Sequence, residues 1–205
     1  YLRHPFEILY GPDDSLWISE KRGSVIKVHP GNGKRRVILD ISASVKFTTS
    51  GNPVTSISQD GMMGLALHPD YPAVDSFFVA YVYNAGAGVR KLRIARYPVK
   101  NTTINSPVGN ETIIIQNIPA SSDHNSGRMI IGPDRKIYYS AGDQGANQFA
   151  NKCNPIRAQD VPTAAELSAQ NYIAYQGKVL RINLDGSIPA DNPVIKSIKS
   201  HIYTF

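Results

Sequence analysis

Cysteine is almost absent from this chain of 205 residues, which contains the single Cys153. One cysteine excludes an intramolecular disulfide and any zinc site built on cysteine ligands. The polar residues around it, Asn151-Lys152 and Asn154-Pro155, indicate an incidental thiol rather than a nucleophile. Long apolar runs are absent too, and none approaches the roughly 18 residues that a membrane span requires. We therefore expect no membrane insertion.

The chain also lacks an initiating methionine and a charged-then-apolar leader, so we interpret it as a trimmed or mature segment. Its net charge is +6, with 41% hydrophobic and 19% charged residues, which is typical of a soluble globular protein. The basic residues are scattered, and the densest cluster is Lys34-Arg35-Arg36. Nucleic-acid binding favours a concentrated basic stripe with interleaved aromatic residues. We therefore expect no nucleic-acid partner.

Short strands and tight turns make up most of the pattern. The first group of strands is expected at residues 6–10, 16–20, 24–29 and 35–39. Similar groups follow at residues 64–68, 77–83 and 92–97, and at residues 128–131, 136–140 and 177–183. A Pro-Asp turn lies between the first two strands of each group, at Pro12, Pro69 and Pro133. One helix is expected at residues 163–172, with Thr163 and Glu166 forming a capping box.

This repetition predicts an all-β fold of about three four-stranded antiparallel blades of a β-propeller. The blade-like units cover residues of about 6–40, 61–118 and 127–190. Propellers close with four to eight blades, and residues 201–205 look like the start of another strand. We therefore expect residues 1–205 to be the N-terminal half of one propeller domain. An open half-ring exposes sheet edges, which favours self-association, including a homodimer.

An acid next to a histidine, Asp123-His124, precedes the hairpin of residues 128–140, and Asp143 follows it. A hairpin returns the chain to its starting end, so Asp143 should lie close enough to orient the His124 imidazole. An imidazole is a suitable base near neutral pH, and a neighbouring carboxylate fixes its tautomer. The pair is our candidate active site. Asp123 could bind substrate or simply cap a turn, and these two roles stay open. Gln59 likewise could have a substrate role or a structural one.

A calcium site is a weaker interpretation of the segment that follows. Asp143-Gln144-Gly145 looks somewhat like a calcium loop but lacks the ligand series of an EF-hand. The single cysteine and the scattered histidines offer no other ligand cluster. The sequence therefore predicts no metal site within this chain.

Four segments together resemble the soluble quinoprotein glucose dehydrogenases and the broader glucose/sorbosone dehydrogenase group. They are residues 59–69 (QDGMMGLALHP), 123–128 (DHNSGR), 142–148 (GDQGANQ) and 177–189 (GKVLRINLDGSIP). The resemblance extends from about Gly11 to the end of the chain. It implies a six-bladed propeller, of which this chain would be half. It also implies oxidation of an aldose at its anomeric carbon to a lactone, with pyrroloquinoline quinone (PQQ) and calcium as cofactors.

The resemblance assigns roles position by position. His124 would be the general base and would face the quinone, and Asp143 would orient it. Sugar contacts are implied at Gln59, Asp123, Gln148 and Phe149. Asp60 stands where the family more often has Asn, which is expected to alter sugar preference.

The resemblance also places the main PQQ and calcium ligands beyond residue 205, so this chain alone is expected to be inactive. The implied partners are an aldose and an external electron acceptor, and the implied location is extracytoplasmic, either periplasmic or secreted. The alternative function is a non-catalytic propeller of the same family that binds a ligand or a protein.

Overall fold

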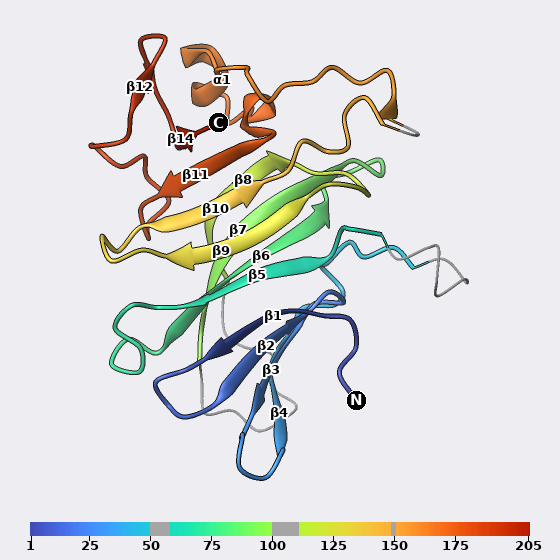
Figure 1. Ribbon diagram of the computed structural model, residues 1–205, viewed down its shortest axis with the longest axis vertical. Coiled ribbons are helices and arrows are strands. Elements are labelled where there is room, and N and C mark those ends of the chain that lie inside the picture. The colour runs from blue at the N-terminus through green and yellow to red at the C-terminus, as the bar shows by residue number, and fades with distance from the viewer. Residues whose placement is uncertain (50–57, 100–110, 149–150) are drawn as a thin grey trace.

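The computed structural model describes residues 1–49, 58–99, 111–148 and 151–205. Three four-stranded antiparallel sheets make up most of the regular structure in these ranges, which confirms the expected all-β fold (Figure 1). The first sheet contains β1 Pro5–Tyr10, β2 Leu16–Glu20, β3 Ser24–Val28 and β4 Arg35–Asp40. The second contains β5 Met62–Leu67, β6 Ser76–Asn84, β7 Arg90–Pro98 and β8 Thr112–Pro119. The third contains β9 Ser126–Ile131, β10 Ile137–Ala141, β11 Lys178–Ile182 and β14 Ile202–Thr204.

The third sheet extends further along the chain than the expected unit of residues 127–190, because β14 pairs with β11. Between these two strands lies a short hairpin, formed by β12 Val194–Ile195 and β13 Ile198–Lys199. The segment before β11 holds α1 Ala164–Ser168 and the 3₁₀ turn η2 Ile173–Tyr175. No helix in the described ranges is both long and apolar enough to cross a lipid bilayer.

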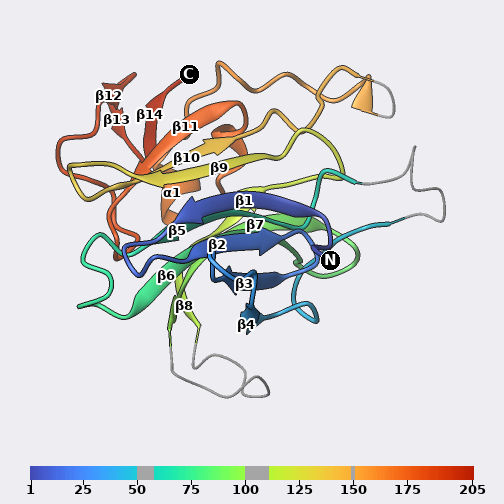
Figure 2. The same ribbon diagram turned by 60° about the horizontal axis from the view of Figure 1, so that its bottom comes forward.

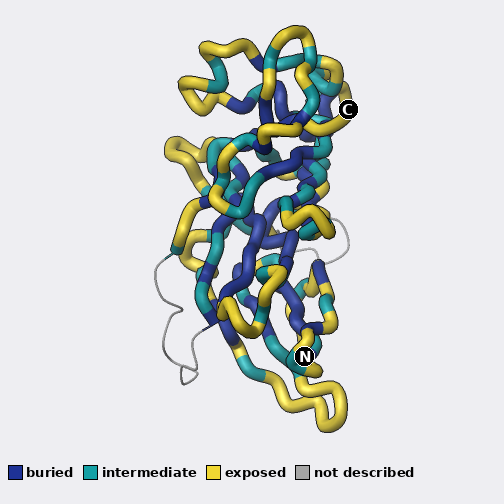
Figure 3. Tube along the Cα trace, turned by 90° about the vertical axis from the view of Figure 1, so that its left-hand side faces the viewer, coloured by how far each residue is buried: buried dark blue, intermediate teal, exposed yellow. Residues whose placement is uncertain are grey.

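The second sheet is buried on both faces, which explains the unbroken apolar runs of β5 and β6 (Figures 2 and 3). Successive side chains of a strand point to opposite faces of its sheet. Phe77 and Val79 accordingly pack into a core shared with the first sheet, while Phe78 and Ala80 pack into a core shared with the third. The three sheets thus stack as consecutive blades, with one apolar core at each of their two boundaries.

The first strand of each sheet lies along the inner side of this stack, with β5 between β1 and β9 (Figure 1). Gly64 allows this approach, since a Cβ there would lie 2.7 Å from the carbonyl oxygen of Gly127. Arg128 of β9 also reaches β1, where its Nη1 bonds Oε1 of Glu7 at 2.9 Å. Glu7 is buried, and burial raises the pKa of its carboxyl group. This ion pair joins the first and third sheets directly.

Candidate active site

His124 lies immediately before β9, and Asp143 lies just after β10, at the same end of the third sheet. Nδ1 of His124 and Oδ1 of Asp143 are 2.9 Å apart. The same Oδ1 accepts a hydrogen bond from the backbone N–H of Gly145 at 3.0 Å. An ionised carboxylate only accepts hydrogen bonds, so Nδ1 of the imidazole carries the proton. In the neutral ring Nε2 is then the free base.

The turn that carries His124 has an unusual backbone. His124 has a φ of +42° and Ser126 has a φ of +61°, values that side-chain-bearing residues adopt only under local constraint. Gly142 supplies part of that constraint, because a Cβ there would lie 1.7 Å from the carbonyl oxygen of His124. Only glycine therefore fits at the residue before Asp143. Strained backbone of this kind often occurs at functional sites.

Asn125 holds this turn closed, a role that the sequence did not suggest. Its side chain is buried, and its amide oxygen accepts from the backbone N–H of Ser121 at 2.9 Å. Its Nδ2 donates to the carbonyl oxygens of Ser121 at 2.8 Å and of Gln59 at 3.2 Å. One buried amide therefore ties the His124 turn to itself and to the segment that precedes β5.

Gln59 and Asp123 both lie against His124. Oε1 of Gln59 accepts from the backbone N–H of His124 at 3.0 Å, and Oδ1 of Asp123 accepts from the same group at 3.0 Å. The Gln59 side-chain NH₂ and the second oxygen of Asp123 are thus the groups best placed to meet a hydroxyl. Four of the six predicted site residues are brought together here: Gln59, Asp123, His124 and Asp143.

The other two predicted residues are less defined. Gln148 is exposed in the loop after Asp143, with its backbone held by hydrogen bonds to Gly145 and Asn151. Phe149 lies outside the described residues.

The expectation that Asp60 alters sugar preference stays a prediction, but the burial of this side chain argues against a direct contact with the sugar. The Asp60 side chain is fully buried, and its Oδ2 bonds Nε of Arg90 at 2.9 Å. Its Oδ1 and Oδ2 also accept from the backbone N–H and hydroxyl of Thr48. Gln59, its neighbour, is exposed, so of these two residues only Gln59 faces outward.

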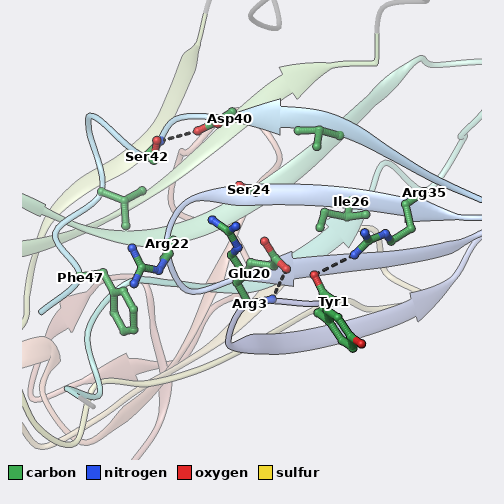
Figure 4. A pocket seen from close by; sticks show the side chains of 12 residues that line it. Tyr1, Arg3, Glu20, Arg22, Ser24, Ile26, Arg35, Asp40, Ser42 and Phe47 are labelled. Atoms are coloured by element: carbon green, nitrogen blue, oxygen red, sulfur yellow. Dashed lines mark hydrogen bonds between the residues drawn. The ribbon is translucent and has the colours of Figure 1, made fainter. Parts of the chain in front are cut away.

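A cavity of about 350 Å³ lies behind Asp143, between the second and third sheets. Its lining includes Arg90, Lys91, Pro119, Asp143, Arg157 and Ile173. A second cavity, of about 770 Å³, lies on the first sheet beside Arg22 and Phe47 (Figure 4). That larger cavity contains none of the predicted site residues, so its size does not make it the candidate site. Within the described ranges, no three His, Cys, Asp or Glu side chains gather to hold a metal ion.

Comparison with known proteins gives a family match over nearly the whole chain. The family model described as Glucose / Sorbosone dehydrogenase matches residues 2–205. Quinoprotein glucose dehydrogenase B of Acinetobacter calcoaceticus is 36% identical over 211 residues, covering 99% of this chain and 42% of that protein. The Hedgehog-interacting protein of Mus musculus is 26% identical and is matched over 96% of this chain and 27% of its own length.

The fold is likewise that of known sugar dehydrogenases. The PQQ-bound aldose sugar dehydrogenase of Streptomyces coelicolor superposes with a TM-score of 0.72 at 19% identity, over 100% of this chain and 50% of that one. The chain therefore spans half or less of the length of each of these three proteins. Its three sheets correspond to about half of such a propeller.

Proposed function

Because this chain belongs to the glucose/sorbosone dehydrogenase family, we propose that the protein containing it oxidises an aldose at its anomeric carbon to a lactone. The observation that carries this proposal is the 2.9 Å contact between His124 and Asp143 within a matching family chain. A relative named as a quinoprotein and a fold shared with a PQQ-bound enzyme support PQQ as the cofactor.

The site fits the sugar-facing half of such a reaction. Asp143 holds the imidazole with its proton on Nδ1, so Nε2 of His124 is free to take the proton of the anomeric hydroxyl. Gln59 and Asp123 would hydrogen-bond the neighbouring hydroxyls and orient the anomeric carbon. PQQ, when bound, supplies the acceptor for the hydride that leaves this carbon. The imidazolium that forms is stabilised by the Asp143 carboxylate.

The residues of this chain fit the cofactor in part. The His124 side chain is partly exposed, with its ring free to face a quinone. Calcium has no ligand cluster among the described residues, so we assign it no step here. We expect the groups that hold PQQ and calcium in the remainder of the protein, and we expect this chain alone to be inactive.

A direct assay tests the proposal. The whole protein, reconstituted with PQQ and calcium, should reduce an artificial electron acceptor when an aldose is added. His124→Ala should lower kcat by about 10²–10⁴-fold, the usual contribution of a general base. His29→Ala, in an exposed turn of the first sheet, is the matched control and should retain activity. No sugar-dependent dye reduction, or full activity of His124→Ala, would contradict the proposal.

The proposal includes an extracytoplasmic location and an external electron acceptor, which the resemblance to the soluble quinoprotein glucose dehydrogenases implies. Fractionation of the source cells checks the location. Recovery of the protein with the cytoplasmic fraction would overturn it.

A non-catalytic binding function is the second candidate. It is favoured by the 26% identity to a protein named for its interaction with Hedgehog, over 96% of this chain. The contact between His124 and Asp143 argues for catalysis instead, because a binding surface does not require an oriented base. Absence of aldose oxidation by the PQQ-loaded protein, with retained folding, would favour this second candidate.

A further inference from the structure

The proposed reaction assigns no role to the cavity between the second and third sheets. It is built entirely from blades that this chain contains, at the ends of β7, β8 and β10 and in the segment before β11. Its volume of about 350 Å³ is at the lower end of the range for small-molecule sites. Two of its lining residues also support the candidate site: Asp143 pairs with His124, and Arg90 pairs with Asp60 behind Gln59.

Two of the cationic side chains that line the cavity have acidic partners, and a third does not. Arg90 forms its ion pair with Asp60, and Arg157 forms one with Asp160 at 2.9 Å. Within the described part of the chain, the ammonium group of Lys91 has neither an ion-pair partner nor a hydrogen-bond partner. Lys91 is half-buried, and desolvation lowers its pKa from the ordinary value. A partly desolvated cation without a partner is unfavourable, and an anionic ligand would relieve this cost.

Asp143 contributes a hydrogen-bond acceptor to the cavity, whereas Lys91 contributes a cation. Its Oδ1 is occupied by His124 and Gly145, which leaves Oδ2 as an acceptor on the cavity wall. A second carboxylate placed there would be repelled, whereas a hydroxyl group would donate to it. Apolar atoms of Val89, Pro119 and Ile173 form the walls between. The cavity thus suits a molecule with a carboxylate at one end and hydroxyl groups along a short carbon chain.

We propose that this cavity binds a small polyhydroxy carboxylate, with its carboxylate at Lys91 and its hydroxyl groups toward Asp143. Aldonates are such molecules, and they form when the lactone product of the proposed reaction opens in water. The choice of an aldonate therefore rests on the proposed function. A product held against Asp143 would contact the residue that orients His124, so the cavity would act as a site of product inhibition.

Calorimetric titration of the whole protein with sodium gluconate tests this site without turnover. Gluconate should bind wild type and the control Lys34→Met equally, and Lys91→Met at least tenfold more weakly. His124→Ala should bind gluconate normally, which separates the cavity from the candidate active site. Lys91→Gln provides a second variant if Lys91→Met fails to fold, as judged by thermal unfolding. Sodium acetate, which has the charge without the hydroxyl groups, should bind more weakly than gluconate.

Several outcomes would overturn the inference. These are no saturable binding by wild type, equal binding by a folded Lys91 variant, loss of binding in His124→Ala alone, or acetate binding as tight as gluconate. The aldose-dependent dye assay and this titration measure different properties, so each can fail without the other. Failure of the proposed function and failure of the inference are therefore distinguishable.

Discussion

Nδ1 of His124 and Oδ1 of Asp143 lie 2.9 Å apart at the open end of a single hairpin. The chain enters β9 just after His124 and leaves β10 just before Asp143. The pair is therefore assembled by local strand pairing and does not depend on the other two sheets. What the second sheet contributes is the Gln59 segment, which fixes the backbone N–H of His124 from outside the hairpin.

Asp143→Asn tests the orienting role. The amide keeps the shape of the side chain but loses the charge that stabilises the imidazolium and fixes its proton on Nδ1. We expect kcat of the PQQ-loaded whole protein to fall by about 10²–10⁴-fold, with a smaller change in KM. Asp70→Asn, which loses an exposed pair with Arg135, is the control and should keep wild-type kinetics. An unchanged kcat in Asp143→Asn would refute the role.

The buried pair of Asp60 and Arg90 makes a different prediction. Asp60→Asn leaves the Arg90 guanidinium without its carboxylate, so we expect a loss of about 3 kcal/mol in the free energy of unfolding. Because Asp60 is fully buried, the ratio of kcat/KM between two aldoses should not change. Urea unfolding and steady-state kinetics check the two parts. A changed sugar preference at unchanged stability would show that Asp60 acts on substrate instead.

His201 predicts a loss of stability in mild acid. Its Nδ1 lies 2.9 Å from the Tyr175 hydroxyl and its Nε2 lies 3.0 Å from the carbonyl oxygen of Gly186. Burial lowers the pKa of His201 below its ordinary value. As pH falls through about 6.5, the unfolded chain takes up a proton that the folded chain resists, so the free energy of unfolding decreases. Urea unfolding on either side of this pH measures the effect.

The matched variants for this prediction are His201→Gln and His29→Gln. His201→Gln should be less stable at neutral pH, yet its stability should depend less on pH than that of wild type. His29→Gln, which changes an exposed residue, should keep the wild-type dependence. An identical pH dependence in all three proteins would rule out His201 as the source.

Buried tyrosines predict a loss of stability in alkali. Burial and a hydrogen bond to Glu111 raise the pKa of Tyr81 to about 12. Burial also raises the pKa values of Tyr97, Tyr139 and Tyr175. Above a pH of about 10 the unfolded chain loses these protons while the folded chain keeps them, so the free energy of unfolding falls as pH rises. Phenolate absorbance of these residues should therefore appear together with the loss of far-ultraviolet circular dichroism.

Tyr139 offers a sharper form of the alkaline test. Its hydroxyl is buried without a hydrogen-bond partner among the described residues. Tyr139→Phe should therefore raise stability by about 1 kcal/mol and reduce its decline in alkali. Tyr175→Phe should lower stability, because it removes the partner of His201. Destabilisation of equal size in both variants would contradict the assigned difference.

Much of the fold could be predicted because it depends on local pattern. The Pro-Asp turns separate strands where they were expected. In two of the three turns the Asp side chain also accepts a hydrogen bond from the aromatic residue four positions on, Trp17 for Asp13 and Tyr138 for Asp134. The capping box of Thr163 and Glu166 is also confirmed. The helix is shorter than residues 163–172, however, because the chain turns into a left-handed conformation at Gln170.

The rest of the site depends on contacts between sheets, which local pattern does not record. Gln59, which precedes β5 of the second sheet, reaches the backbone N–H of His124 in the third sheet. Asn125 looked like one more polar residue of a loop, and only the folded turn shows its amide buried among three backbone groups. The pairing of His124 with Asp143 could be predicted since one hairpin brings both residues to the same end.

The bond between Arg128 and Glu7 joins residues 121 positions apart, so it forms only long after Glu7 has been synthesised. Chains grow at about 5–20 residues per second, so the partner of Glu7 is made on the order of ten seconds after it. Throughout that interval the Glu7 carboxylate has no counter-ion from the third sheet and keeps its hydration. β1 is thus among the last of the described strands to reach its final environment, and a nascent chain arrested before Arg128 should leave β1 open to protease.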